Sequence, residues 1–417
     1  MREAEAMGAG FANASKGYRD TTHRLVPPDT TFQQVSPFAA VMGITRIANV
    51  TGLDNVGIPV VMVCRPNSRS ISVSQGKGYD LISAKVSGLM ESVESFHAER
   101  ISHPLKLCSL EDLRYTEAVV DVDRLPRLSD SKFTPFARIL WVEGEDLLGG
   151  ARRWVPYEMV HLDYTLPLPS GHGCFQASSN GLASGNHYLE ATTHAICELI
   201  ERDAITLWHQ LAAEDREATR VDLNTVTDVR CRDLLDRFAQ AGVMVAVWEA
   251  TSDIGVPVFL CRILQEDSGL ANTIRPSAGM GCHLVREVAL LRALTEAAQS
   301  RLTFIAGARD DMPRQGYEQF LDPKTHEVWR SAMAPRGGGR DFLDAPSYHG
   351  RSFEEDLRLQ LDRLKSVGIE EVIVVDLTKP EFKIPVVRAV IPGLEGLDSS
   401  ARYVPGERVR RLKGGEA

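Results

Sequence analysis

The sequence lacks paired cysteines, long apolar runs and an excess of positive charge. Its seven cysteines are scattered and form no CxxC pair, which disfavours a disulfide framework and a structural zinc site. The first twenty residues contain no signal-peptide core, and the apolar runs are too short to span a bilayer. The net charge of −9 provides no positive field for nucleic acid or an anionic membrane. We therefore expect a cytoplasmic protein with no nucleic-acid or membrane partner.

Several common catalytic motifs are also missing. The glycine-rich stretch at 76–78 has Ile71 and Gly78 where a Walker A loop needs glycine and a hydroxyl residue. That stretch contains no GxGxxG dinucleotide fingerprint, and the GLASG around Ser184 is not a GxSxG nucleophile elbow. An ordinary P-loop is therefore excluded there, and hydride transfer and serine hydrolysis lose their main support.

Three segments share one plan, beginning at Gly43, Gly242 and Gly368. Each starts with glycine and a β-branched run, passes a polar turn and resumes as Ile-Pro-Val or Val-Pro-Val. This pattern predicts a strand, a turn and a second strand. Helical patterns at 231–241 and 353–367 precede the second and third copies. We expect an α+β fold of layered helices and β-hairpins, with internally repeated hairpin-helix units.

Two longer predicted helices, 79–100 and 188–210, carry glutamates at matching distances from a preceding glycine. The offsets are 13 and 16 residues in both copies, and an alanine recurs at offset 6. The matched residues are Gly78, Ala84, Glu91 and Glu94 in the first copy, and Gly185, Ala191, Glu198 and Glu201 in the second. A weaker third copy near Gly281 ends in Glu296, Gln299 and Arg301, with offsets shifted by two.

Polar and acidic residues gather on one face of each of these predicted helices. They are Ser87, Glu91 and Glu94 in the first helix, and Asn186, Glu190, His194 and Glu201 in the second, with Glu198 at the edge. One interpretation is a pair of solvated helix faces. The other is a carboxylate cluster whose repulsion a cation offsets. Hard oxygen ligands favour Mg²⁺ shared with nucleotide phosphates, and glycine turns supply N–H groups to the same phosphates.

Three long motifs resemble the YcaO superfamily. They are SVSQGKGYDLISAKVSGLMESVE, SSNGLASGNHYLEATTHAICELIERDA and EAAQSRLTFIAGARDD. The resemblance extends over a predicted domain at 16–396, with an N-terminal extension at 1–15 and a C-terminal tail at 397–417. It implies a YcaO-like fold and an enzyme that uses ATP and Mg²⁺ to phosphorylate the oxygen of a peptide backbone amide.

The resemblance also implies a role for each matching residue. The implied Mg²⁺ ligands are Glu91, Glu94, Glu198 and Glu201. The implied nucleotide contacts are Lys16, Ser87, Asn186, Glu190 and Arg202. Arg202 and Arg301 are the implied catalytic residues that meet phosphate oxygens, since a guanidinium presents a fork of donors to an oxyanion. His194 is a candidate acid or base, with a structural histidine as the alternative.

The sequence is more similar to the branch that works beside a TfuA-like partner and makes thioamides with sulfide. The stretches that carry this similarity are TGLDNVGIPV, RPNSRSISVSQGKG and QSRLTFIAGARDD. Two alternatives stay open. One is an azoline-forming cyclodehydratase with a separate E1-like, leader-binding partner, because no E1-like segment precedes the motifs. The other is a non-catalytic, nucleotide-binding accessory factor for ribosomal-protein methylthiolation. The expected partners are a peptide substrate and a TfuA-like or E1-like protein, and because family members are often dimers, a homodimer stays open.

Overall fold

The computed structural model describes residues 14–266, 276–309, 323–334, 337–396 and 402–414. Contacts divide the chain into two compact units. The first unit comprises Met1–Pro27, Val93–Gln210 and Gly350–Ala417; the second comprises Pro28–Ser92 and Leu211–His349. Among the described residues, no helix combines the length and apolar character needed to cross a membrane.

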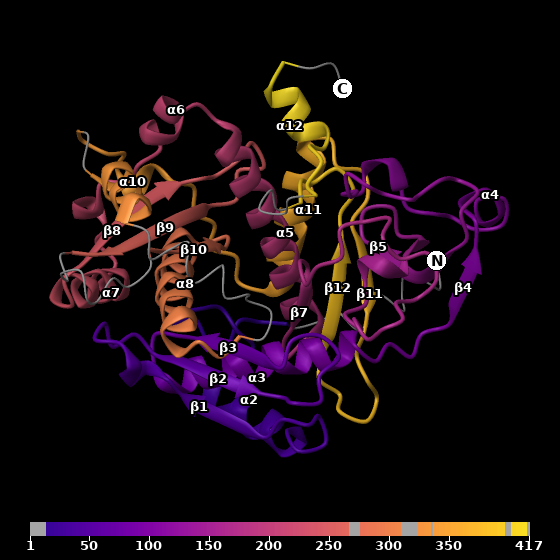
Figure 1. Ribbon diagram of the computed structural model, residues 1–417, viewed down its shortest axis with the longest axis horizontal. Helices are drawn as coiled ribbons and strands as arrows, with labels where there is room; N and C mark the ends of the chain where they lie inside the picture. Colours follow the sequence, from indigo (N-terminus) through magenta and orange to yellow (C-terminus); the bar gives the residue numbers. More distant parts are fainter. Residues whose placement is uncertain (1–13, 267–275, 310–322, 335–336, 397–401, 415–417) are drawn as a thin grey trace. The chain divides into compact units, whose positions relative to one another are not determined.

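The second unit contains two three-stranded antiparallel sheets (Figure 1). One is ordered β1 (Arg46–Asn49), β2 (Val60–Cys64) and β3 (Val73–Lys77). The other is ordered β10 (Ser277–Cys282), β9 (Val258–Gln265) and β8 (Val243–Glu249). The helices assigned to this unit are α2 (Pro28–Val35), α6 (Ala213–Ala218), α7 (Val229–Gln240), α8 (Arg286–Ala306) and α10 (Pro323–Met333).

The first unit is built on a six-stranded antiparallel sheet. Its main path is β4 (Leu105–Cys108), β5 (Ile139–Asp146), β11 (Ile373–Asp376), β12 (Val386–Val390) and β7 (Leu182–Ser184), and β6 (Arg152–Pro156) pairs with β5. Its helices are α4 (Leu110–Leu113), α5 (Tyr188–Gln210), α11 (Phe353–Ser366) and α12 (Glu407–Leu412). Helix α3 (Leu81–Ala98) crosses the division, with its residues from Val93 onward in the first unit.

The predicted hairpins and α+β fold are confirmed. Each hairpin pairs with a third strand, and that strand leads into a long helix. The three copies are β1, β2, β3 and α3; β8, β9, β10 and α8; and β11, β12, β7 and α5. In the last copy, the third strand and its helix precede the hairpin in the chain. Figure 1 shows α8 running along the β8–β10 sheet and α5 beside β7 and β12.

The strand register corrects the alignment of the weak copy. In each copy, the residue after the recurring proline begins the second hairpin strand and pairs with the last residue of the third strand; these pairs are Val60 with Lys77, Val258 with Cys282, and Val386 with Ser184. The next residues along the chain are Gly78, His283 and Gly185. Counted from His283 instead of Gly281, Ala289 stands at offset 6 and Glu296 and Gln299 at offsets 13 and 16. The apparent shift of two residues was wrong, and all three helices follow one register.

Close contact between the third strand and its helix explains the glycines. A Cβ atom on Gly76 would come within 2.0 Å of the Ala84 carbonyl oxygen on α3, and one on Gly281 within 2.0 Å of the Ala289 carbonyl oxygen on α8. Because both obstacles are backbone atoms, a side chain at either position would force the strand and helix apart. The recurring glycines therefore serve packing in both copies.

The segment predicted as a C-terminal tail contains α12, which packs against α5. Arg408 of α12 donates from Nε to both oxygens of Asp203 at 2.9 and 3.2 Å. The buried Glu395 carboxylate accepts the backbone N–H groups of Gly406 and Val409, at 2.8 and 2.9 Å. These bonds tie α12 to the first unit, while the domain limits at 16 and 396 stay predictions.

Candidate nucleotide and metal site

One glutamate of the first motif contacts the start of the second motif. The Glu94 carboxylate accepts hydrogen bonds from the backbone N–H of Ser184 at 2.8 Å and from its hydroxyl at 2.7 Å. Ser184 ends β7, the strand that leads into α5. Two sequence motifs ninety residues apart therefore meet at this serine.

Glu190 lies at the beginning of α5 and is only 1% exposed. One carboxylate oxygen accepts a bond from the Asn186 side-chain amide at 3.2 Å, and the other accepts the backbone N–H of Leu25 at 2.8 Å. The Arg24 guanidinium lies 3.7 Å from the first oxygen. The predicted pair of Asn186 and Glu190 is thus brought together, and the N-terminal segment at 24–25 covers it.

Arg202 contacts two of the glutamates of α5, Glu198 and Glu201. Its Nη2 lies 3.4 Å from Glu198, and its Nη1 lies 3.2 Å from Glu201. Glu198 also accepts the backbone N–H of Gly181 at 3.3 Å. Glu201 is 7% exposed. Solvated helix faces are therefore the wrong interpretation for Glu190 and Glu201, because both carboxylates are buried.

Helix α3 carries Ser87, Glu91 and Glu94 in steps of one turn, so they lie along one side of the helix. All three are half-buried. His194 is half-buried on α5. The ligand roles of Ser87 and Glu91 and the acid-base role of His194 stay predictions.

Lys16 forms a buried ion pair in the first unit. Its Nζ lies 2.6 Å from Oδ2 of Asp356 on α11 and donates to the Gly350 carbonyl oxygen at 2.9 Å. Burial lowers the pKa of Lys16 and raises the pKa of Asp356, since desolvation disfavours both charges. The predicted phosphate contact would require Lys16 to leave this internal partner.

Arg301 forms its contacts within the second unit. Its Nε donates to Asp54 at 2.8 Å, and its Nη2 donates to Gln265 at 2.7 Å. The arginine side chain is 1% exposed. Arg301 is therefore a buried, paired residue of α8 rather than an open helix-surface cation, and its phosphate role stays a prediction.

Metal binding by the four glutamates is compatible with their chemistry. Across the described residues, no three His, Cys, Asp or Glu side chains gather closely enough to hold a metal ion. Mg²⁺ is usually held by one or two carboxylates together with substrate phosphates, and does not need a cage made wholly of protein. The carboxylate pairs on α3 and α5 provide oxygen donors of this kind, and their metal roles stay predictions.

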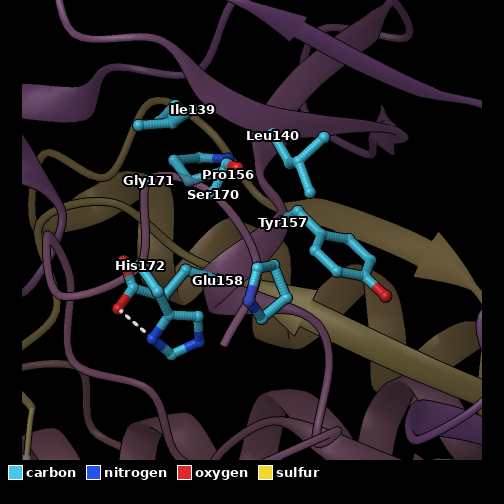
Figure 2. A pocket seen from close by; sticks show the side chains of 9 residues that line it. Ile139, Leu140, Pro156, Tyr157, Glu158, Ser170, Gly171 and His172 are labelled. Carbon is cyan, nitrogen blue, oxygen red and sulfur yellow. Dashed lines mark ion pairs between the residues drawn. The ribbon is translucent and has the colours of Figure 1, made fainter. Parts of the chain in front are cut away.

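A polar chain in the first unit was missed by the sequence interpretation. The buried Glu158 carboxylate accepts the backbone N–H groups of Gly173, Cys174 and Phe175 at 2.7, 3.0 and 3.1 Å. It also lies 3.1 Å from Nδ1 of His172, as Figure 2 shows beside a small pocket. His172 and His161 approach through their Nε2 atoms at 3.1 Å. These hydrogen bonds order the loop before β7. The residues that form them follow no recognisable spacing in the sequence.

Ser184 and Arg388 were also overlooked. Ser184 was considered only as a serine nucleophile, although it immediately precedes the recurring Gly185. Arg388 interrupts the apolar run of β12 with a charge, which was a visible signal of an unusual buried group.

Comparison with known proteins identifies the family. A family model described as YcaO cyclodehydratase, ATP- and Mg²⁺-binding, matches residues 75–395. The chain is 36% identical to an uncharacterized protein in the tfuA 3′ region of Rhizobium leguminosarum bv. trifolii, over 100% of this chain and 99% of the relative.

Two solved structures have a similar fold. A heterocyclase in complex with substrate and cofactor matches with a TM-score of 0.79 at 22% identity, over 98% of this chain and 57% of the heterocyclase chain. YcaO from Methanopyrus kandleri, bound with AMPPCP and Mg²⁺, matches with a TM-score of 0.74 at 22% identity, over 95% of this chain and 99% of that one. The family match and the full-length relative show that this chain belongs to the YcaO family, whose cofactors are the ATP and Mg²⁺ expected from the sequence.

Proposed function

We propose that this chain transfers the γ-phosphoryl group of ATP to the oxygen of a peptide backbone amide, and that sulfide then replaces the phosphorylated oxygen to give a thioamide. The observation that carries the thioamide product is the full-length similarity to a protein encoded in a tfuA 3′ region. On this basis the partner is a TfuA-like protein. Phosphate leaves with the former amide oxygen, so every atom is accounted for.

The residues of α5 suit the phosphoryl transfer. Bound Mg²⁺ would offset phosphate charge, and Glu198 and Glu201 of α5 with Glu91 and Glu94 of α3 are the proposed ligands. Arg202 already contacts two carboxylates, at 3.4 and 3.2 Å, and can exchange one of these for a phosphate oxygen. The proposed catalytic role of Arg301 requires the same exchange from Asp54.

Asn186 and Glu190 are proposed to bind the nucleotide, together with Ser87 and Lys16. The Asn186 amide and the Glu190 carboxylate are already hydrogen-bonded at 3.2 Å, so their orientation is fixed before a ligand arrives. Such preorganisation lowers the entropic cost of binding.

The test uses the purified chain with a TfuA-like partner, a candidate peptide, Mg-ATP and sulfide. Exchange of oxygen for sulfur adds about 16 Da to the peptide, whereas cyclodehydration removes about 18 Da, which follows from the chemistry that phosphoryl activation permits. We expect the gain, together with peptide-stimulated ATP turnover that Glu91→Ala and Glu201→Ala abolish. Tight ATP binding without stimulated turnover by any peptide would instead support an accessory factor.

Azoline formation is the second candidate, because the matching family is described as a cyclodehydratase and one neighbour in fold is a heterocyclase. In that reaction a Cys, Ser or Thr side chain of the peptide is the nucleophile, and the partner is a leader-binding E1-like protein. A loss of about 18 Da without added sulfide would favour this candidate over the thioamide.

A further inference from the structure

Arg388 is a charged residue in the middle of β12. Its neighbours across the sheet are Leu182 on β7 and Val375 on β11. The residues on either side of it, Val387 and Ala389, belong to the apolar cluster that includes Ala191 and Ala195 of α5. Because strand residues alternate in direction, the Arg388 side chain lies on the opposite face of the sheet from α5.

The Arg388 guanidinium is buried but incompletely paired. The residue is 1% exposed, and its Nη2 donates to the Ser178 carbonyl oxygen at 2.6 Å. Its Nε and Nη1 atoms are buried and have no hydrogen-bond partner among the described residues. Within the described part of the chain, no carboxylate lies within ion-pair distance of it.

Two other buried arginines each have the carboxylate partner that Arg388 lacks among the described residues. Arg408, in the same unit, is 8% exposed and contacts both oxygens of Asp203. Arg301, in the second unit, contacts both oxygens of Asp54. Removing a cation from water without a counter-charge destabilises the folded protein. Arg388 bears this cost in the structure without a compensating carboxylate.

Arg388 remains a cation at neutral pH. Burial lowers the pKa of its guanidinium to about 10, and Tyr164 and Glu198 counteract that shift. His161 senses the same positive charge, which contributes to lowering the pKa of that histidine. Glu198 therefore attracts Arg388 electrostatically without forming an ion pair with it.

We propose that Arg388 belongs to a phosphate-binding site, in which phosphate oxygens accept bonds from its unpaired donors. An oxyanion supplies the missing negative charge and several acceptor atoms at once. This site rests on the proposed function only in the choice of phosphate as the oxyanion, with the nucleotide and released inorganic phosphate as the two sources.

Access requires a local movement, since the two donors have no exposed surface in the structure. The contact that covers Nη2 comes from the loop at Ser178, which precedes β7. We therefore expect phosphate to change the protection of backbone amides at 176–181 from hydrogen exchange.

The experiment measures thermal unfolding of the full chain with increasing inorganic phosphate, and separately with a non-hydrolysable ATP analogue and Mg²⁺. Wild type should be stabilised as either ligand is added. Arg388→Met should weaken the response by about tenfold or more in ligand concentration, as expected for a lost charged hydrogen bond. Without ligand, Arg388→Met should unfold at or above the wild-type temperature, because the uncompensated charge is gone.

Arg408→Met is the matched control, since it removes another buried arginine of the same unit, one that has its own carboxylate. It should unfold at a lower temperature and keep the full response to phosphate. If Arg388→Met does not fold, Arg388→Lys, which keeps the charge but not the geometry, should fold and respond more weakly than wild type.

The outcomes test the phosphate site and the proposed function independently. A response to phosphate and to the ATP analogue that survives Arg388→Met would overturn the site, and so would a wild type that responds to neither. A response lost in Arg388→Met while no peptide is modified would retain the phosphate site and remove the thioamidation proposal. A response to the analogue but not to phosphate would assign the site to the nucleotide.

Discussion

Helices α5 and α8 hold equivalent positions in two copies of the repeat but differ in charge. Glu198 and Glu296 each accept a backbone N–H group from the region of their own third strand, from Gly181 at 3.3 Å and from Met280 at 3.1 Å. One turn later, α5 has a second glutamate, whereas α8 has Gln299. The difference teaches that the first position, Glu198 or Glu296, contacts its own strand region in both copies. Only α5 adds a second carboxylate, Glu201, beside the proposed ligand Glu198.

The cations that meet these glutamates also differ. Lys77 of β3 lies 2.5 Å from Glu296 and neutralises it within the second unit. In α5, Arg202 is shared between two carboxylates at longer distances, 3.4 and 3.2 Å. Glu296 is therefore paired with a cation of its own unit, whereas Glu198 and Glu201, the proposed magnesium ligands, share Arg202.

The largest expected effect is a difference in ATP turnover when the same substitution is made at equivalent positions of α5 and α8. Glu198→Gln should lower peptide-stimulated ATP turnover by about 10²-fold, since it removes a charge that stabilises phosphoryl transfer. Glu296→Gln, at the equivalent position, should leave turnover within about twofold. Steady-state ATP hydrolysis by folded samples of both variants measures the contrast, and equal losses in the two would contradict it.

Lowering the pH should destabilise the first unit more than the second. Burial lowers the pKa of His97 and of His161, both in the first unit, to about 4. Between pH 6.5 and 4 the unfolded chain takes up these protons and the folded chain does not, so stability falls as the pH falls through this window. The loss is about 2 kcal/mol per histidine between pH 6.5 and 5.

Hydrogen exchange at pH 7 and pH 5, corrected for the intrinsic rate, measures this loss unit by unit. Protection should fall more in the first unit than in the second, and His97→Gln should reduce the difference. An equal loss of protection in both units would contradict the assignment of the buried histidines as its cause.

The smallest effect concerns the internal cation. Lys77→Met should lower the free energy of unfolding by about 1–2 kcal/mol, because Glu296 is left largely buried without its partner. Adding Glu296→Gln to that variant should recover much of the loss. Urea unfolding of the wild type, the two single variants and the double variant gives the coupling energy. Additive effects would mean that Lys77 does not neutralise Glu296 in solution.

Local patterns predicted much of this fold. Helix α5 begins and ends at the predicted residues 188 and 210, and the three hairpins begin their second strands after the recurring prolines. These features depend on hydrophobic periodicity and on the missing N–H of proline, both of which are visible within a short window of sequence.

Contacts distant in sequence were not predictable. The ion pair of Lys16 with Asp356 joins residues 340 positions apart, and the bond between Arg301 and Asp54 spans 247 positions. The matching spacings indicated that glutamates recur. They did not indicate that Ser184 donates hydrogen bonds to Glu94, or that Arg388 has no counter-ion among the described residues. Such partners depend on which elements pack together, and single-sequence periodicity carries no information on that choice.

The chain order of the α5 copy affects how the protein is made. Strand β7 and α5 are complete by residue 210, but β11 and β12, which extend their sheet, come only at 373–390. The larger part of the second unit, Leu211–His349, is synthesised in between and follows the earlier part, Pro28–Ser92. During translation, α5 therefore cannot pack on its complete sheet until β12 has been made, whereas the second unit can fold earlier. In ribosome-bound chains halted near residue 380, the backbone amides of α8 should be protected from hydrogen exchange and those of α5 should not.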